Sequence, residues 1–246
     1  MTYCVALRLN RGLVFAADTR TSAGSDNVAV FRKLYYWRRI GERVVVLMSA
    51  GNLAVTQSVV SLLNEQLDAE AAPETESIMT APSLYRVARL VGDALREVRK
   101  IDGAALEDSG STFNANFILG GQVGAEAPRL FHIYPEGNFI EATDDTPYFQ
   151  LGESKYGKPI LDRVISMATP QKEAAKCVLI SFDSTMKSNI SVGLPIDLLW
   201  YPRDSLRVGM QQRIREGDPY FTMLRSRWGG GLRRVFSELP DPDWLE

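Results

Sequence analysis

The feature that most constrains the fold of this chain is the order of its hydrophobic patterns, because patterns typical of strands and patterns typical of helices follow one another in groups. Short apolar segments typical of buried strands come in groups, and amphipathic helices follow them in pairs. The sequence therefore predicts strands, two helices, strands, two helices and a closing strand. Grouped strands and grouped helices favour separate layers over a βαβ parallel sheet. We expect an α+β fold, a four-layer αββα sandwich with two antiparallel sheets between pairs of helices.

The predicted strands are separated by turn residues and by the helices. Apolar side chains dominate each segment, and Gly12 and Gly41 lie in two of the turns between neighbouring strands. The predicted strands cover residues 3–9, 13–17, 33–38, 43–48, 112–119, 129–134, 138–142, 148–151 and 196–201.

The predicted helices are recognised by apolar residues at spacings of three and four. In the second helix these residues run from Leu84 to Val98, and Ser83 lies in the cap that precedes them. The predicted helices cover about residues 53–69, 84–98, 155–167 and 170–185. After the second helix, the polar segment 102–111 is expected to lead the chain back to strands.

The chain carries no internal linker and no low-complexity segment. We therefore expect one domain over residues 1–201, followed by a C-terminal extension over residues 202–246. This extension is rich in Arg, Gly, Pro and Trp. It is expected either to pack on its own domain or to make inter-subunit contacts.

Charge and composition exclude several classes of protein. With 28 Lys and Arg against 30 Asp and Glu among 246 residues, the chain has no basic footprint for a nucleic-acid backbone. No apolar run approaches the roughly 18–20 residues of a membrane span, and the N-terminus does not read as a signal peptide. Cys4 and Cys177 lie in apolar surroundings, which predicts buried thiols in a reducing compartment. We expect a cytoplasmic protein without nucleic-acid or membrane partners.

The single histidine narrows the chemistry further. His132 lies in an apolar strand segment, and no second histidine or neighbouring carboxylate accompanies it. Ser-His-Asp and Cys-His sites would depend on this one ring, and a zinc site would lack its usual ligands. We therefore expect a half-buried strand histidine, no metal and no cofactor. If the protein is a hydrolase, its general base is not imidazole.

Three residues together can supply a nucleophile and a base without histidine. Thr2 becomes the N-terminal residue when the initiator methionine is removed, and its hydroxyl and α-amine then form a nucleophile–base pair. An α-amine has an ordinary pKa of about 7.7–8.0, close to that of a working general base. Lys33 would lower that pKa and stabilise negative charge at the hydroxyl, and Asp18 would orient Lys33.

Each of these residues also has an ordinary structural interpretation. A threonine after the initiator is common, Asp18 could pair with Arg20 at the end of a strand, and Lys33 could be a solvated surface residue. The conjunction of all three, in this order and spacing, favours catalysis.

The N-terminal segments of the chain resemble those of a known family. Residues 2–7 together with residues 12–21 are similar to the amino-terminal signature of proteasome β-type subunits, which are N-terminal-nucleophile hydrolases and include the bacterial peptidase HslV. The resemblance implies that Lys33 is the active-site lysine. It also implies that the segment Ser49-Ala50-Gly51 supplies an oxyanion donor, the Gly51 amide, at the start of a helix.

Two later segments resemble turns that support the N-terminal amine in this family. Residues 151–154 are similar to the Gly-Ser-Gly turn, with either Glu153 or Ser154 in place of its serine. Residues 188–193 are similar to the Asp-x-x-Ser-Gly turn, in which Ser188 replaces the aspartate and Ser191 matches the serine. These replacements imply that activity could be weak.

The extension and the segment 23–27 make the chain most similar to the bacterial proteasome-like group called Anbu, the ancestral β subunit. This resemblance implies self-association into a large homo-oligomeric ring or a helical, lock-washer assembly. It also implies a polypeptide substrate. Nothing in the sequence suggests ATP binding, so any unfolding of substrates would require a separate ATPase.

The sequence is compatible with three functions. The first is a threonine peptidase that cleaves amide bonds through an acyl-enzyme on Thr2. The second is a catalytically weak or inactive assembly subunit, which the altered turns and the arginine-rich tail at 225–234 favour. The third is an amidase of the same mechanism that acts on a small or modified peptide substrate, because a fold does not fix its substrate.

Overall fold

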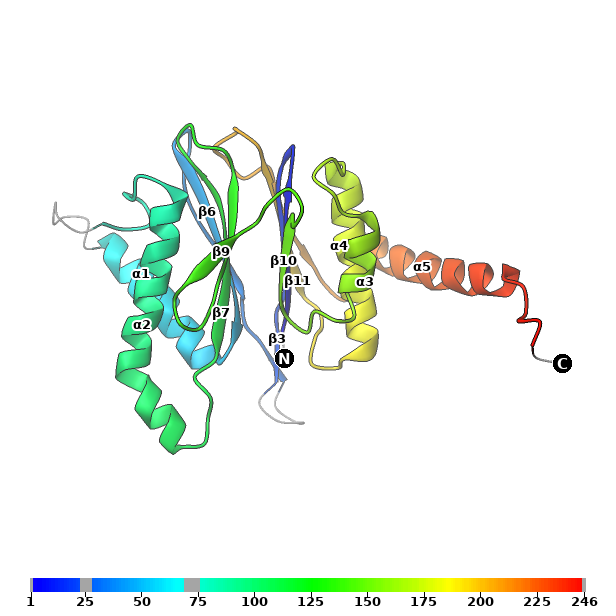
Figure 1. Ribbon diagram of the computed structural model, residues 1–246, viewed down its shortest axis with the longest axis horizontal. Coiled ribbons are helices and arrows are strands. Elements are labelled where there is room, and N and C mark those ends of the chain that lie inside the picture. The colour runs from blue at the N-terminus through cyan, green and yellow to red at the C-terminus, as the bar shows by residue number, and fades with distance from the viewer. Residues whose placement is uncertain (1, 23–27, 69–75, 245–246) are drawn as a thin grey trace.

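The protein is a stack of four layers in which two β-sheets lie face to face between helices (Figure 1). The computed structural model describes residues 2–22, 28–68 and 76–244. Helices α1 (Leu53–Asp68) and α2 (Leu84–Asp108) cover one sheet. Helices α3 (Lys158–Val164) and α4 (Gln171–Ser188) cover the other. The predicted αββα sandwich is confirmed.

Both large sheets are antiparallel, with five strands each among the described residues. The first has the order β10-β1-β2-β11-β12 and the second the order β5-β6-β7-β8-β9, while β3 and β4 form a separate ribbon. The strands are β1 (Tyr3–Leu9), β2 (Gly12–Asp18), β3 (Arg20–Ser22), β4 (Val28–Val30), β5 (Leu34–Arg39), β6 (Arg43–Gly51), β7 (Ala115–Val123), β8 (Arg129–Ile133), β9 (Phe139–Glu141), β10 (Tyr148–Gly152), β11 (Ile196–Pro202) and β12 (Met210–Ile214).

The alternation of side chains along each strand builds the core. On β1, Tyr3 and Val5 pack against the cluster under α3 and α4, whereas Cys4 and Ala6 join the cluster between the sheets. Both faces of the central strands are therefore covered, which explains why the sequence shows continuous apolar runs there instead of a polar alternation.

The structure corrects two helix boundaries. Helix α2 continues through the polar segment to Asp108, because Leu106 still packs against the core and the turn that ends the helix comes only at Gly110, which has a φ of +73°. Helix α3 is shorter than the predicted 155–167 and covers only Lys158–Val164, with Pro159 in its first turn.

The C-terminal extension contains two elements that the sequence did not reveal. Strand β12 pairs with β11 and completes the edge of the first sheet. Helix α5 (Pro219–Glu238) begins at the Asp218 cap and then projects away from the four layers (Figure 1). Its first turns are fixed to α4, because the Arg225 Nε donates to the buried Asp183 Oδ1 at 2.7 Å.

Both cysteines are buried thiols, as their apolar surroundings in the sequence predict. Cys4 and Cys177 are free and buried, and burial raises the pKa of the Cys177 thiol to about 11. Among the described residues, none of the helices has the length and apolar character needed to cross a bilayer.

Close packing between the sheets generates the first prediction. A methyl group at Gly120 would lie 2.7 Å from the Phe15 ring in the core, whereas one at Gly230 in α5 would meet nothing within 4 Å. We expect Gly120→Ala to lower the free energy of unfolding by about 1–3 kcal/mol because the core is overpacked. Gly230→Ala, the matched control, leaves it unchanged or raises it by up to about 1 kcal/mol. Urea denaturation measures both, and equal stability of the two variants would contradict this packing.

Candidate active site

A buried ion pair joins the two sheets at the end where β2 finishes and β5 begins. Asp18 is the last residue of β2 and Lys33 directly precedes β5. The Lys33 Nζ donates to the Asp18 Oδ1 at 2.8 Å and to the Arg20 carbonyl oxygen at 2.6 Å. Asp18 is fully buried and Lys33 is 5% exposed. The interpretation of Lys33 as a solvated surface residue is therefore wrong.

Backbone groups hold the Asp18 carboxylate from two further directions. The Tyr3 N–H donates to its Oδ1 at 3.0 Å, and the Gly193 N–H lies 3.4 Å from its Oδ2. Burial raises the pKa of the Asp18 carboxyl, while the Lys33 ammonium and these two donors oppose that rise. The carboxylate thus links the start of β1, the end of β2 and the turn before β11.

The backbone of Thr2 is fixed by the neighbouring strand β10 and the turn that follows it. Its carbonyl oxygen accepts a hydrogen bond from the Glu153 N–H at 2.7 Å. Gly152 has a φ of +76°, and a Cβ there would lie 1.9 Å from the same oxygen, so only glycine fits. Thr2 is 9% exposed, and it directly precedes the residue whose N–H binds Asp18.

A pocket of about 460 Å³ brings Thr2, Lys33 and Gly51 together. Gly51 ends β6 with a φ of +118°, and a Cβ there would lie 2.1 Å from the Asn114 carbonyl oxygen. Asn52 then caps α1, since its Oδ1 accepts from the Ala54 N–H at 3.0 Å. The pocket is lined by Thr2, Thr21, Lys33, Ser49, Ala50, Gly51, Asn52, Leu53, Thr56, Asn114, Asn116 and Gly152.

The four remaining candidates lie outside this lining. Glu153 is buried, and its Oε2 accepts from the Asn189 Nδ2 at 2.8 Å, while the Asn189 Oδ1 accepts from the Ser191 N–H at 2.9 Å. The carboxylate of Glu153 therefore ties the turn after β10 to the turn after α4. Ser154 is partly buried next to it, and Ser188 is an exposed residue at the end of α4.

Sequence reasoning missed several residues around the site. Thr21, Asn114 and Asn116 line the pocket, and Gly193 donates to Asp18. Asn114 and Asn116, which flank the first residue of the apolar strand β7, were the available signal, because polar side chains at the start of a buried strand need partners or solvent. Residues 23–27, which contributed to the resemblance, and Met1 lie outside the described residues.

The histidine behaves as the sequence predicts. His132 lies on β8, half-buried, with its ring 4.5 Å from the Tyr134 ring centroid. Burial lowers the pKa of its imidazole, and it does not line the pocket. Within the described ranges, no cluster of three or more His, Cys, Asp or Glu residues could hold a metal ion.

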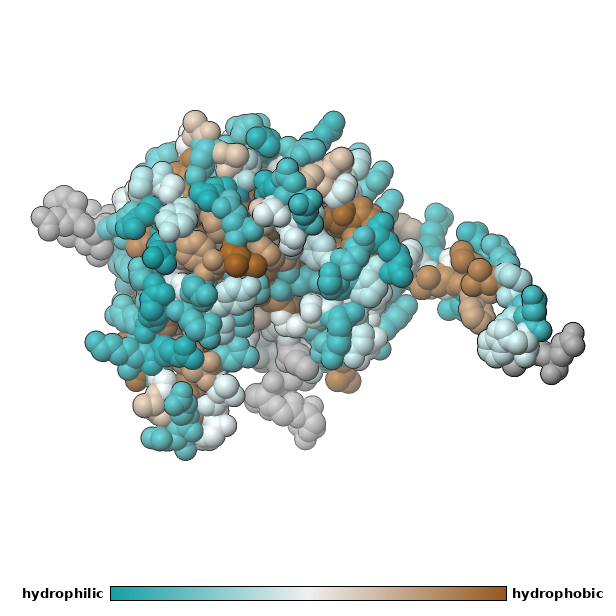
Figure 2. All heavy atoms as spheres, in the orientation of Figure 1, coloured by the Kyte–Doolittle hydropathy of each residue, from teal (hydrophilic) through white to brown (hydrophobic). Residues whose placement is uncertain are grey.

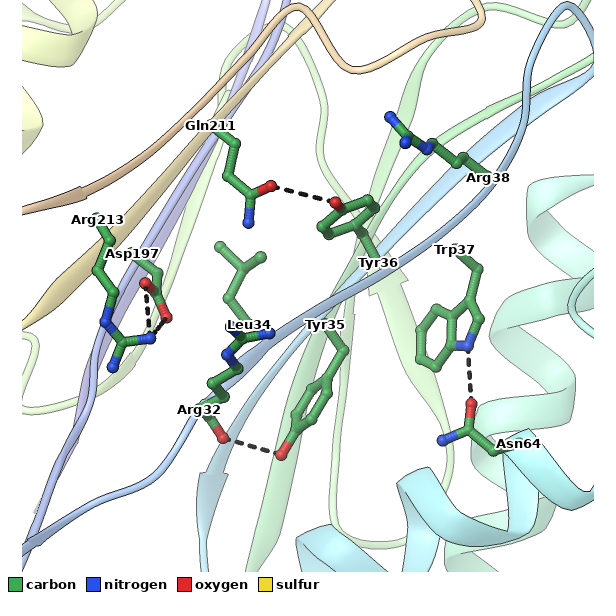
Figure 3. Close-up of a pocket in the computed structure, with 10 residues that line it drawn as sticks. All are labelled: Arg32, Leu34, Tyr35, Tyr36, Trp37, Arg38, Asn64, Asp197, Gln211 and Arg213. Carbon is green, nitrogen blue, oxygen red and sulfur yellow. Dashed lines mark hydrogen bonds and ion pairs between the residues drawn. The ribbon is translucent and has the colours of Figure 1, made fainter.

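A larger hollow of about 680 Å³ lies elsewhere, between the edge strands β5 and β12 (Figure 3). The Tyr36 hydroxyl donates to the Gln211 Oε1 at 3.1 Å and joins the two sheets there. On its wall, Asp197 pairs with Arg213 at 3.3 Å. None of the residues singled out from the sequence lines this hollow.

One known protein family matches most of the chain. The family model of the proteasome subunit matches residues 2–200. A comparison of the sequence with curated proteins gives no match.

Solved structures of similar sequence cover nearly the whole chain. Anbu from Hyphomicrobium sp. strain MC1 is 59% identical, with a TM-score of 0.92 over 98% of this chain and 100% of that chain. Anbu (ancestral beta-subunit) from Yersinia bercovieri is 53% identical, with a TM-score of 0.92 over 100% of both chains. The chain in a helical assembly of the Anbu complex from Pseudomonas aeruginosa is 47% identical, with a TM-score of 0.93 over 99% of both chains.

The buried ion pair generates the second prediction. Lys33→Met leaves the Asp18 carboxylate buried without its counter-charge, which lowers the free energy of unfolding by about 3–5 kcal/mol. Adding Asp18→Asn restores much of that loss. As a matched control, Lys155→Met removes a lysine whose side chain is 71% exposed and costs at most about 1 kcal/mol. Denaturant unfolding measures the free energy of unfolding of all three variants. A decrease of less than about 1 kcal/mol for Lys33→Met would contradict a buried ion pair at this position.

Proposed function

Because this chain belongs to the Anbu group of the proteasome subunit family, we propose that it is a threonine-type amide hydrolase whose nucleophile is Thr2. The substrate is a polypeptide, and the products are two shorter peptides. The observation that carries this proposal is the buried Asp18–Lys33 pair, whose lysine lines the same pocket as Thr2.

The chemistry proceeds by acyl transfer to Thr2 and hydrolysis by water. The Thr2 hydroxyl attacks the carbonyl carbon of the substrate, and the α-amine of the same residue accepts the hydroxyl proton. The amine then gives this proton to the leaving nitrogen as the amide bond breaks. Water, deprotonated by the same amine, attacks the resulting ester and releases the acyl group.

Neighbouring groups act on the charges that develop during these steps. The Lys33 ammonium lowers the pKa of the α-amine and stabilises negative charge at the Thr2 oxygen. The Gly51 amide, at the junction of β6 and α1, binds the oxyanion, and the partial positive charge of the helix start adds to this effect. Asp18 positions Lys33 and does not touch the substrate.

A buried ion pair is itself evidence for a functional role. Removing two charges from water costs several kcal/mol per ion. A protein in which apolar residues of similar size replace such a pair is often as stable as the original or more stable. The sheets could therefore be joined at this point without Asp18 and Lys33. Their retention beside Thr2 supports a role in tuning its amine.

The base exists only after the initiator methionine has been removed. While Met1 is attached, the nitrogen of Thr2 is an amide that cannot accept a proton. The proposed activity therefore depends on processing, and an unprocessed chain is inactive.

Ser188, Ser191, Glu153 and Ser154 belong to the proposal as supports of this terminus. The Glu153 N–H that binds the Thr2 carbonyl and the Glu153–Asn189 hydrogen bond favour Glu153 as the residue that steadies the turn. Ser188 and Ser191 lie on the other side of that hydrogen bond, so they act only through the turn after α4.

Self-association completes the proposal. The Pseudomonas aeruginosa relative is described as a helical assembly, which supports the helical, lock-washer alternative over a closed ring for this chain. The C-terminal extension provides inter-subunit contacts, and the free, buried thiols are consistent with the cytoplasm. A separate ATPase would supply any unfolding of the substrate.

The third prediction tests the nucleophile. In chains whose mass confirms loss of Met1, Thr2→Ala keeps the α-amine but removes the hydroxyl, so hydrolysis of fluorogenic peptides falls by about a thousandfold or more. Thr222→Ala, which removes an exposed hydroxyl from α5, leaves the rate unchanged and is the matched control.

Two outcomes would favour the alternative functions. If processed wild-type protein and Thr2→Ala show the same rate on every substrate, the chain is an assembly subunit without this activity. If Thr2 is required for cleavage of small amides but peptides are not cleaved, the amidase is correct. The rate of each substrate class, measured on the same processed sample, separates these results.

A further inference from the structure

Strand β5 is the outermost strand of its sheet, and one of its edges has no partner strand among the described residues. The Ser49 N–H donates to the Lys33 carbonyl oxygen at 3.0 Å, and β5 continues this register along β6. Because bonded residues alternate in an antiparallel ladder, the N–H and C=O groups of Leu34, Tyr36 and Arg38 point away from β6. Unpaired backbone groups in a row are a template for an added strand.

The hollow of about 680 Å³ lies along this open edge (Figure 3). Its lining includes every residue of β5 from Leu34 to Arg38. At about 3.3 Å per residue, an extended segment of roughly five residues can lie against this length of edge.

Aromatic side chains border the open edge on both faces of β5. Tyr35 and Trp37 pack on the cluster under α1 and α2, whereas Tyr36 packs on the cluster between the sheets. The Trp37 Nε1 donates to the Asn64 Oδ1 at 2.9 Å, and the Tyr35 hydroxyl donates to the Arg32 carbonyl oxygen at 2.8 Å. These side chains are held in place before any ligand arrives, so binding loses less free energy to ordering them.

The face of β5 that lies toward the other sheet is basic. Arg38 shares this face with Tyr36, and its guanidinium lies 6.0 Å from the centre of the Tyr36 ring. Arg32 and Arg213 line the same hollow, where Asp197 is the one carboxylate. Figure 3 shows Arg32 and Arg213 toward one end of the hollow and Arg38 toward the other.

The carboxylate of Asp197 does not balance these arginines. It already pairs with Arg213 at 3.3 Å. Burial raises the pKa of the Asp197 carboxyl, and the charges of Arg213 and Arg32 oppose that rise. Within the described ranges, neither Arg32 nor Arg38 forms an ion pair with a carboxylate. The hollow therefore favours a ligand that brings carboxylates of its own.

The two faces of the edge select different side chains in an added strand. Side chains of an extended segment alternate between the faces of a sheet. Those on one face would lie beside Arg32 and Arg38, and those on the other beside Tyr35 and Trp37. The segment that fits both faces alternates acidic with apolar residues.

A second copy of this chain is a poorer occupant of the same edge. Pairing β5 with another β5 would bring the Arg32 and Arg38 side chains of both copies to one hollow. Like charges placed together disfavour such a contact.

We propose that the open edge of β5 and the hollow beside it bind an extended acidic segment of another polypeptide, which adds as an antiparallel strand and alternates acidic with apolar residues. No residue lines both this hollow and the Thr2 pocket, so the proposal stands or falls independently of the proposed activity.

The first test measures the fluorescence anisotropy of labelled peptides with the full-length Thr2→Ala variant, which cannot cleave them by the proposed mechanism. We expect a peptide of alternating glutamate and valine, as long as β5, to bind. A peptide of the same composition, with its glutamates and valines in two blocks, should have a dissociation constant at least about tenfold higher, because it cannot satisfy both faces. Equal affinity of the two peptides, or no binding of the alternating one, overturns the proposal.

Methyl groups on the peptide backbone test the strand pairing itself. In the proposed antiparallel register, glutamates lie opposite Leu34, Tyr36 and Arg38, so their N–H groups bond to β5 and those of the valines point away. N-methylation of the glutamates should raise the dissociation constant at least about tenfold, whereas N-methylation of the valines leaves it nearly unchanged. Equal effects of the two modifications would show that no strand forms at this edge.

Charge reversal in the protein tests the location. In the same Thr2→Ala chain, Arg32→Glu with Arg38→Glu should raise the dissociation constant of the alternating peptide at least about tenfold. The matched control, Arg89→Glu with Lys100→Glu, makes the same change in net charge at exposed positions of α2 and keeps the original affinity. Far-ultraviolet dichroism confirms that both variants are folded.

Two results of this experiment contradict the proposal. One is an equal loss of affinity in both double variants, which means that the peptide responds only to overall charge. The other is a molar mass, measured by light scattering, that changes in the Arg32 and Arg38 variant while the parent chain binds no peptide. In that case a second copy covers the edge.

Discussion

The buried pair of Asp18 and Lys33 is the interaction on which the candidate site depends. It joins the end of β2 in one sheet to the start of β5 in the other, and it draws in the Tyr3 and Gly193 amides and the Arg20 carbonyl. The N–H of Tyr3 fixes the chain immediately after Thr2. One carboxylate thus positions both the lysine and the terminus that the lysine is proposed to tune.

The sequence predicted the layers well because the hydrophobic periods of strands and helices differ and alternate in groups. It placed helix ends less well. The polar segment after Val98 looked like a loop, but Leu106 keeps α2 on the core until Gly110. Helix α5 was missed because three consecutive glycines argue against a helix, and only contacts beyond the local sequence can offset that preference.

The sequence singled out the central residues of the candidate site and, through the family resemblance, the turns at residues 151–154 and 188–193, but it did not predict the contacts between those turns. Thr2, Asp18 and Lys33 can be recognised from their chemistry, their order and the resemblance to proteasome subunits. The contacts of Glu153 with Thr2 and Asn189 join turns far apart in the chain, and no local pattern encodes such pairings.

The pKa of the Thr2 α-amine in the processed chain tests the central claim most directly, and ¹⁵N NMR titration of labelled threonine measures it. We expect a pKa below the ordinary range of about 7.7–8.0 because the Lys33 ammonium disfavours a second positive charge. In the Asp18→Asn, Lys33→Met double variant, the pKa should return toward that range. An amine that titrates in the ordinary range in both proteins would contradict the claim that this pair tunes the base.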